Sequence, residues 1–151
     1  MLTTMGLQVS VIGSGAAWDD AAEEVGRLLA QQGCTVVTGG LGEVMAAAHR
    51  GAKAAGGTTL AILPGEDRDA ANPWADHVVV TGIGHARNLA VAASGQAVIA
   101  VGGSYGTIAE MALALRLGRR VVALRGAPDV EGALTASSPA EAVELALRDL
   151  G

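Results

Sequence analysis

Residues 96–110 read QAVIAVGGSYGTIAE, an apolar run that ends in two glycines and continues into a stretch suited to a helix. The first six residues do not alternate between apolar and polar, which is typical of a strand with helices on both of its faces. The sequence therefore predicts a buried strand over residues 96–101, then a glycine-rich turn, then a helix that ends at Gly118.

The same order of elements recurs on either side of this segment. Further strands are predicted at residues 7–12, 34–38, 58–63, 77–80 and 120–124. Further helices are predicted at residues 19–32, from the glycine turn at 39–42 to about residue 55, at 84–94 and from 138 to about 150. Because apolar strands alternate with helices throughout, we expect one α/β domain over residues 1–151. Its fold should be a Rossmann-like, doubly wound parallel sheet with helices on both faces. Ligands of such sheets bind at the carboxyl ends of the strands, where this chain has its glycine clusters.

The composition narrows the class of partner. Half of the 151 residues are hydrophobic and the mean hydropathy is +0.39, yet no apolar run approaches the roughly 20 residues that cross a bilayer. A surface shared between subunits would account for the excess, so we expect a homo-oligomer (dimer or tetramer) and no membrane contact. The net charge of −5 and the lack of a basic run argue against a nucleic-acid partner. No secretion signal opens the chain, so we expect a cytoplasmic location.

Cysteine and histidine do not point to redox or metal chemistry. Cys34 begins an apolar segment and is predicted to be a buried small hydrophobe rather than a nucleophile. His49, His77 and His85 fall on different predicted elements and lack the spacing of a metal site. We therefore expect no metal and no required cofactor.

The first candidate ligand site is the turn Gly13, Ser14 and Gly15, which follows the first strand. Glycine here lets the backbone turn tightly and lets an anion approach the free N–H groups of the next helix. The dinucleotide fingerprint would need a third glycine where this chain has Trp18, and an acid after the second strand where it has Thr38 and two glycines. NAD binding is therefore disfavoured, and a plain tight turn is an alternative.

The second candidate site is the turn that contains Gly39, Gly40 and Gly42. Two consecutive glycines followed by a third exceed what a turn requires. They favour a contact between backbone N–H groups and a ribose or phosphate. Close packing of helix on strand is the alternative.

The third turn carries the strongest signal, because its glycines expose backbone donors at a helix start and its hydroxyls add further donors. The predicted phosphate-binding residues are Gly102, Gly103, Ser104, Tyr105, Gly106 and Thr107. Glu110 follows, and Thr107 and Glu110 also have the spacing of a capping box, which would give the glutamate a purely structural role.

Arg87 is unusual because it falls in the first turn of a predicted helix, at the positive end of the dipole, where a cation is slightly unfavourable. His85 lies beside it. An incoming anion would explain both. The alternatives are a surface ion pair between Arg87 and a loop carboxylate such as Asp76, and a surface or capping role for His85.

These motifs together resemble one known group. The pair Arg87-Asn88, the string GGSYGTIAE at residues 102–110 and the string GGLGEVM at residues 39–45 are similar to the Lonely Guy superfamily, also called possible lysine decarboxylases. Within it, the chain resembles a short Rossmann-fold branch that includes molybdenum cofactor carrier proteins. The resemblance covers nearly the whole chain.

The resemblance implies a pocket for a nucleoside monophosphate, usually at a dimer interface. In the enzymatic members, an arginine and a glutamate at the positions of Arg87 and Glu110 serve cleavage of an N-glycosidic bond, which releases the base and ribose 5-phosphate. The chain departs from their motif at Val101, where they have proline, and at Asn88, where they have lysine. Both departures favour the carrier branch.

We therefore expect a binding or carrier protein for a phosphorylated nucleotide- or pterin-like molecule, with an AMP-like nucleotide or the molybdenum cofactor as bound ligand. The alternative function is a nucleoside 5′-monophosphate phosphoribohydrolase in which Arg87 and Glu110 are catalytic. A protein with a vestigial pocket is a third interpretation. Both main hypotheses require that the N–H groups after residues 12, 38 and 101 converge on one anion.

Overall fold

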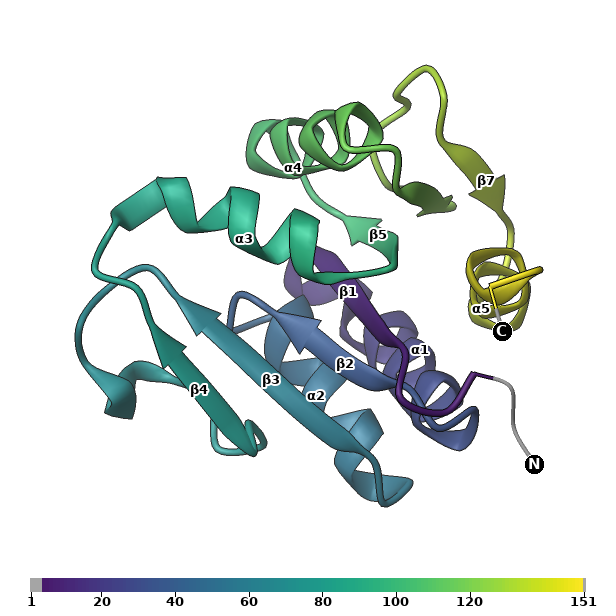
Figure 1. Ribbon diagram of the computed structural model, residues 1–151. Coiled ribbons are helices and arrows are strands. Elements are labelled where there is room, and N and C mark those ends of the chain that lie inside the picture. The colour runs from purple at the N-terminus through teal and green to yellow at the C-terminus, as the bar shows by residue number, and fades with distance from the viewer. Residues whose placement is uncertain (1–3, 151) are drawn as a thin grey trace.

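A computed structural model describes residues 4–150, and in this part of the chain seven parallel strands form one sheet in the order β4-β3-β2-β1-β5-β6-β7. The strands are β1 (Gln8–Ser14), β2 (Thr35–Thr38), β3 (Thr58–Leu63), β4 (His77–Val80), β5 (Ala97–Gly102), β6 (Arg120–Leu124) and β7 (Leu134–Ala136). Every residue of β5 is buried, as the sequence predicts. The chain moves outward in one direction from β1 to β4 and in the other from β5 to β7 (Figure 1).

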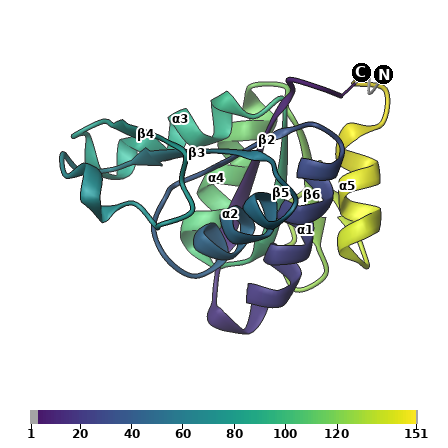
Figure 2. The ribbon, with the colours of Figure 1, turned by 90° about the horizontal axis from the view of Figure 1, so that it is seen from below.

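Helices cover both faces of the sheet (Figures 1 and 2). They are α1 (Asp19–Gln31), α2 (Val44–Ala54), α3 (Arg87–Ser94), α4 (Tyr105–Arg116) and α5 (Pro139–Leu147), with short 3-10 turns η1 (Ala16–Trp18), η2 (Arg68–Ala70) and η3 (Gly84–Ala86). α1 packs against α2 and α5 over one hydrophobic cluster, and α3 packs against α4 over a second. The predicted doubly wound α/β fold is confirmed.

Successive residues of the central strands supply these two cores in turn. Val9 and Val11 belong to the cluster under α1, α2 and α5, whereas Ile12 belongs to the cluster under α3 and α4. Ser10 lies on the α3 side and donates from its hydroxyl to the carbonyl of Val91 at 2.6 Å. Burial on both faces is the reason why these strands lack an alternating pattern.

The strand β7 was not predicted. It has three residues, pairs only with β6 at the sheet edge, and two of its residues are exposed. Its pattern is too short to stand out from a loop. The other predicted elements exist, although the predicted helix at 84–94 divides into η3 and α3.

The helices α1 and α2 approach each other through glycine. A Cβ atom added to Gly26 would lie 1.9 Å from the carbonyl oxygen of Ala48, and one added to Gly51 would lie 1.9 Å from the carbonyl oxygen of Glu23. The two backbones are therefore in direct contact, which any side chain at these positions would prevent.

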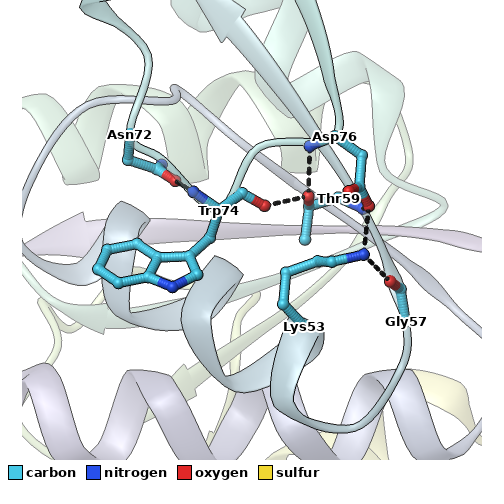
Figure 3. Close-up of polar contacts among 6 residues, drawn as sticks. All are labelled: Lys53, Gly57, Thr59, Asn72, Trp74 and Asp76. Atoms are coloured by element: carbon cyan, nitrogen blue, oxygen red, sulfur yellow. Dashed lines mark hydrogen bonds and ion pairs between the residues drawn. The ribbon is translucent and has the colours of Figure 1, made fainter.

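The loop between β3 and β4 is exposed over residues 65–70, and its second half is fastened to the domain (Figure 3). Lys53 Nζ lies 2.8 Å from the carboxylate of Asp76 and donates to the carbonyl of Gly57 at 2.8 Å. The Thr59 hydroxyl donates to the carbonyl of Trp74 at 2.6 Å and accepts from the N–H of Asp76 at 2.8 Å. These bonds fix the start of β4 beside the end of α2.

Two findings bear on other predictions. Cys34 is buried, as predicted, and burial raises the pKa of its thiol to about 11, so it is not a thiolate at neutral pH. Between residues 4 and 150, no helix combines the length and apolar character that crossing a bilayer requires.

Candidate functional site

A cavity of about 170 Å³ lies at the carboxyl ends of β1, β2 and β5, between the turns that follow them. The strands β2 to β4 lie on one side of β1 and the strands β5 to β7 lie on the other, so the strand order changes direction between β1 and β5. Ligands of open α/β sheets bind at such a switch point. The three glycine turns therefore share one opening. Eight of the predicted site residues line it: Gly13, Ser14, Gly39, Arg87, Ser104, Gly106, Thr107 and Glu110.

The other predicted site residues lie outside this lining: Gly15, Gly40, Gly42, Gly102, Gly103 and Tyr105. Several of these glycines make room for a neighbouring side chain. Trp18 Cδ1 lies 3.1 Å from the Cβ position of Gly15 and 2.2 Å from that of Gly102. The Cβ position of Gly40 lies 2.6 Å from the Cβ of Ala61 in β3, which supports the packing alternative for that residue.

The remaining three differ from one another in surroundings. Gly103 has φ +108°, and its Cβ position is 2.0 Å from the hydroxyl of Thr107, so it allows that side chain to sit under the turn. Gly42 is exposed, and a Cβ there would meet nothing within 4 Å. Tyr105 is 88% exposed.

Arg87, the first residue of α3, reaches back to the ends of two strands. Its Nη1 donates to the carbonyls of Gly39 at 2.5 Å and Ile62 at 2.8 Å, and its Nε donates to Asn88 Oδ1 at 3.0 Å. A Cβ on Gly39 would lie 2.2 Å from Nη1, so glycine is required for this contact. The suggested ion pair with Asp76 is wrong, because Asp76 pairs with Lys53.

Glu110 lies in the second turn of α4 and turns toward the same cavity. Burial raises the pKa of its carboxyl to about 7, and the nearby charge of Arg87 acts in the opposite direction. Burial lowers the pKa of Arg87, an effect that Glu110 partly offsets. At neutral pH Glu110 therefore exists in both protonation states and can donate or accept a proton.

The capping-box interpretation of Thr107 and Glu110 is wrong. α4 begins at Tyr105 with Ser104 as its N-cap, so Thr107 is already inside the helix, with its side chain buried. The Ser104 side chain makes no capping hydrogen bond. The first amides of α4 are thus left without a side-chain cap beside the cavity, where they favour an anion.

The second turn is held by a buried histidine. His49 Nε2 lies 3.2 Å from the hydroxyl of Thr38, which in turn accepts from the N–H of Gly40 at 2.9 Å. His49 Nδ1 lies 3.2 Å from the side-chain amide of Asn72, whose backbone N–H donates to the carbonyl of Gly40 at 2.8 Å. Burial lowers the pKa of His49 to about 4, so the ring is neutral at pH 7 and accepts from Asn72 through Nδ1.

Five lining residues were not among the predicted site residues: Val11, Ile12, Met45, His85 and Asn88. Val11 and Ile12 carry no motif that a sequence could reveal, whereas Met45 ends the string GGLGEVM of the second turn. Asn88 could have been found, because it follows Arg87 directly and its amide oxygen orients that guanidinium. His85 lies in η3 and is exposed at the rim.

Over residues 4–150, histidine, cysteine, aspartate and glutamate side chains form no group of three or more that could hold a metal ion. The chemistry of the cavity is instead that of a cation, a helix N-terminus and a carboxyl with a raised pKa, which together suit an anionic group.

Known proteins share this fold. The model of the SLOG cluster4 family matches residues 6–147, in agreement with the resemblance to the Lonely Guy group. An uncharacterised protein of Archaeoglobus fulgidus is 44% identical over 140 residues, which cover 91% of this chain and 92% of that protein.

Two solved structures are similar over nearly their full length. The molybdenum cofactor binding protein of the phototrophic bacterium Rippkaea orientalis has a TM-score of 0.83 and 35% identity, over 92% of this chain and 93% of its own. The molybdenum cofactor carrier protein of Chlamydomonas reinhardtii has a TM-score of 0.82 and 34% identity, over 91% of this chain and 93% of its own.

Proposed function

The chain belongs to the SLOG cluster4 family, and from that premise we propose that it binds and carries a phosphorylated nucleotide- or pterin-like small molecule. The molybdenum cofactor is the favoured cargo, because two similar proteins bind or carry it. The observation that carries the proposal is that Arg87 and the uncapped N-terminus of α4 line one cavity. As the sequence predicts, we also propose that the protein is cytoplasmic and has no nucleic-acid partner.

The residues of the cavity are suited to binding a phosphate group, and none of the contacts described below requires cleavage of the ligand. Phosphate oxygens would accept from the first amides of α4 and from the hydroxyl of Thr107. Arg87 would supply positive charge, and the protonated form of Glu110 would add an O–H donor. Because Asn88 accepts from the Nε of Arg87, the guanidinium is held in place before the ligand arrives.

We propose that a second copy of the chain completes the site. A cavity of about 170 Å³ is smaller than the roughly 300–1,000 Å³ of typical small-molecule sites, so part of the ligand must lie outside it. Four exposed apolar side chains lie within two residues, along the sequence, of residues that line the cavity: Ile83, Leu89, Tyr105 and Ile108. Covering them by a partner subunit would account for the apolar composition of the chain.

Phosphoribohydrolase activity is the second candidate, favoured by one observation. Glu110 and Arg87 line the same cavity, and a carboxyl with a pKa of about 7 suits general acid or base catalysis at neutral pH. A carboxylate at this place could also stabilise the positive charge that develops on the sugar as the N-glycosidic bond breaks.

Binding and turnover are separated by one pair of measurements. The purified protein is mixed under anaerobic conditions with molybdenum cofactor released from a molybdoenzyme, and gel filtration removes the free cofactor. A carrier retains molybdenum and pterin with the protein. In parallel the protein is incubated with AMP, and chromatography detects free adenine. Retention without adenine supports the carrier, whereas adenine release that Glu110→Gln abolishes supports the hydrolase.

A matched pair of glycine variants locates the binding. Gly103→Val would drive a side chain into Thr107, 2.0 Å from the Cβ position, and should abolish retention of the cofactor. Gly65→Ala, in an exposed loop with nothing within 4 Å of the Cβ position, should retain it as the wild type does. Equal retention by both variants would contradict binding at this cavity.

A further inference from the structure

Glu43 stands out because it is a non-glycine residue in a left-handed backbone conformation, with φ +55° and ψ −129°. Side chains with a Cβ rarely adopt this conformation, and such strain persists only where the surrounding structure holds it. Glu43 is the N-cap of α2, so the strain lies in the second glycine turn, between Gly39 and Met45, which both line the cavity.

The side chain of Glu43 reaches across to the first turn. Its Oε2 accepts a hydrogen bond from the N–H of Gly15 at 2.6 Å, the short length of a charge-assisted bond. Gly15 directly follows Ser14, which lines the cavity. The Gly15 N–H, one of the amides that the first turn could offer to a phosphate, is therefore already taken by a carboxylate of the protein itself.

At the third turn, in contrast, no side chain caps the helix start. Ser104, the N-cap of α4, makes no side-chain capping bond, and Arg87 lies across the cavity from the same helix start. Ser14 and Gly102 are paired residues on adjacent strands, and such strands lie about 4.8 Å apart. Two phosphates that share a bridging oxygen could therefore place one group on each turn if both turns were open.

Resting on the proposed function, we propose that Glu43 is a specificity-determining residue that restricts the site to ligands with a single phosphate group. One phosphate binds at the N-terminus of α4 beside Arg87. A second phosphate directed at the first turn meets the Glu43 carboxylate, which repels it and holds the Gly15 N–H. Monophosphates are accepted and diphosphates are disfavoured.

The test compares AMP with ADP by isothermal titration calorimetry. The wild type should bind AMP at least tenfold more tightly than ADP. Glu43→Gly removes the charge, frees the Gly15 N–H and suits the backbone conformation, so its affinity for ADP should rise at least tenfold while its affinity for AMP changes less than threefold. Its melting temperature should not fall, since glycine relieves the strain.

Two further variants distinguish the effect of the Glu43 charge from the effect of its hydrogen bond to the Gly15 N–H. Glu43→Gln keeps an acceptor for the Gly15 N–H but loses the charge, so its gain in ADP affinity should be smaller than that of Glu43→Gly. Glu131→Gly removes an exposed carboxylate from the loop before β7 and should leave the preference unchanged. If AMP binds but Glu43→Gly keeps the wild-type preference, the role of Glu43 is refuted and the proposed function stands. If neither nucleotide binds to any variant and molybdenum cofactor is not retained, both are refuted.

Discussion

The two helical layers that cover the sheet differ in the side chains they turn outward. α1 carries five charged residues in thirteen, and the α1–α2 layer contains the ion pair between Arg50 and Glu23 at 3.0 Å. α3 has one charged residue in eight and α4 has two in twelve. Of these three, Arg87 and Glu110 line the cavity, so only Arg116 among them is an exposed charge.

The α1–α2 layer therefore has the charged surface expected next to solvent, whereas the α3–α4 layer has few exposed charges, as expected of a surface that a partner subunit would cover. The charged layer uses close backbone packing inside and ion pairs outside. The α3–α4 layer exposes Leu89, Tyr105 and Ile108, each of which is next in sequence to a residue that lines the cavity. Some of the exposed apolar side chains thus adjoin the candidate ligand site, which is what a shared, two-subunit pocket would require.

The largest expected effect is on self-association. Leu89→Asp combined with Ile108→Asp places charges on the apolar layer, and the dissociation constant of the oligomer should rise at least a thousandfold, about 4 kcal/mol. Sedimentation velocity over a concentration series measures it. Ala54→Asp, an exposed position on α2, should leave self-association unchanged. A monomeric wild type would overturn the comparison of the layers.

The next effect concerns Glu110 and pH. An unfolded glutamate has a pKa near 4.5, whereas burial raises that of Glu110 to about 7. Between these values the folded chain holds a proton that the unfolded chain releases, so this group lowers the free energy of unfolding as pH rises, by about 3 kcal/mol in total. Glu110→Gln should remove that contribution, as measured by urea denaturation at pH 4.5 and 7.5.

The effect of Glu110 is seen in the difference between wild type and variant in how the free energy of unfolding depends on pH, because other groups also contribute to each protein's own dependence. His49, with a pKa that burial lowers to about 4, is protonated in the unfolded chain before it is in the folded one. Its contribution therefore rises with pH through the range from about 4 to 6.5 and opposes that of Glu110. Parallel curves for wild type and Glu110→Gln would show that the carboxyl is not buried as described.

A smaller effect is expected from packing in the charged layer. Gly51→Ala forces a methyl group against the carbonyl of Glu23, 1.9 Å away, and should reduce the free energy of unfolding by about 2 kcal/mol. Gly106→Ala in α4 meets nothing within 4 Å and should be neutral or stabilising by up to about 1 kcal/mol. Chemical denaturation distinguishes them, and equal losses would mean that the α1–α2 contact is not close.

The smallest effect is expected at the surface. Glu23→Gln removes the partner of Arg50, and an exposed ion pair of this kind contributes about 0.2–1 kcal/mol. The change should shrink further at high salt, which the same denaturation experiment can follow. A loss larger than that of Gly51→Ala would reverse the order proposed for this layer.

Much of the fold could be predicted because strand burial and glycine turns are local signals. The unpatterned apolar run of β5 and the glycines after three strands predicted a candidate site at the carboxyl ends of these strands. The purpose of individual glycines could not be predicted, because it depends on residues distant in sequence. Gly39 leaves room for Arg87, and Gly40 leaves room for β3.

The same limit applies to side-chain roles. The spacing of Thr107 and Glu110 fits a capping box as well as a cavity wall, and only the start of α4 at Tyr105 decides between them. The contact between Glu43 and Gly15 joins two turns through a backbone conformation that a sequence pattern does not disclose.

Trp18 has one more consequence. Its indole fills the space left by three glycines, Gly15, Gly102 and Gly126, and so bridges the first and third turns. Any movement of either loop alters the surroundings of that ring, and therefore its emission. Trp74, the second tryptophan of the chain, can be replaced with phenylalanine to leave a single fluorophore. If a ligand moves either turn, the emission of Trp18 should change, and binding could be followed without an attached dye.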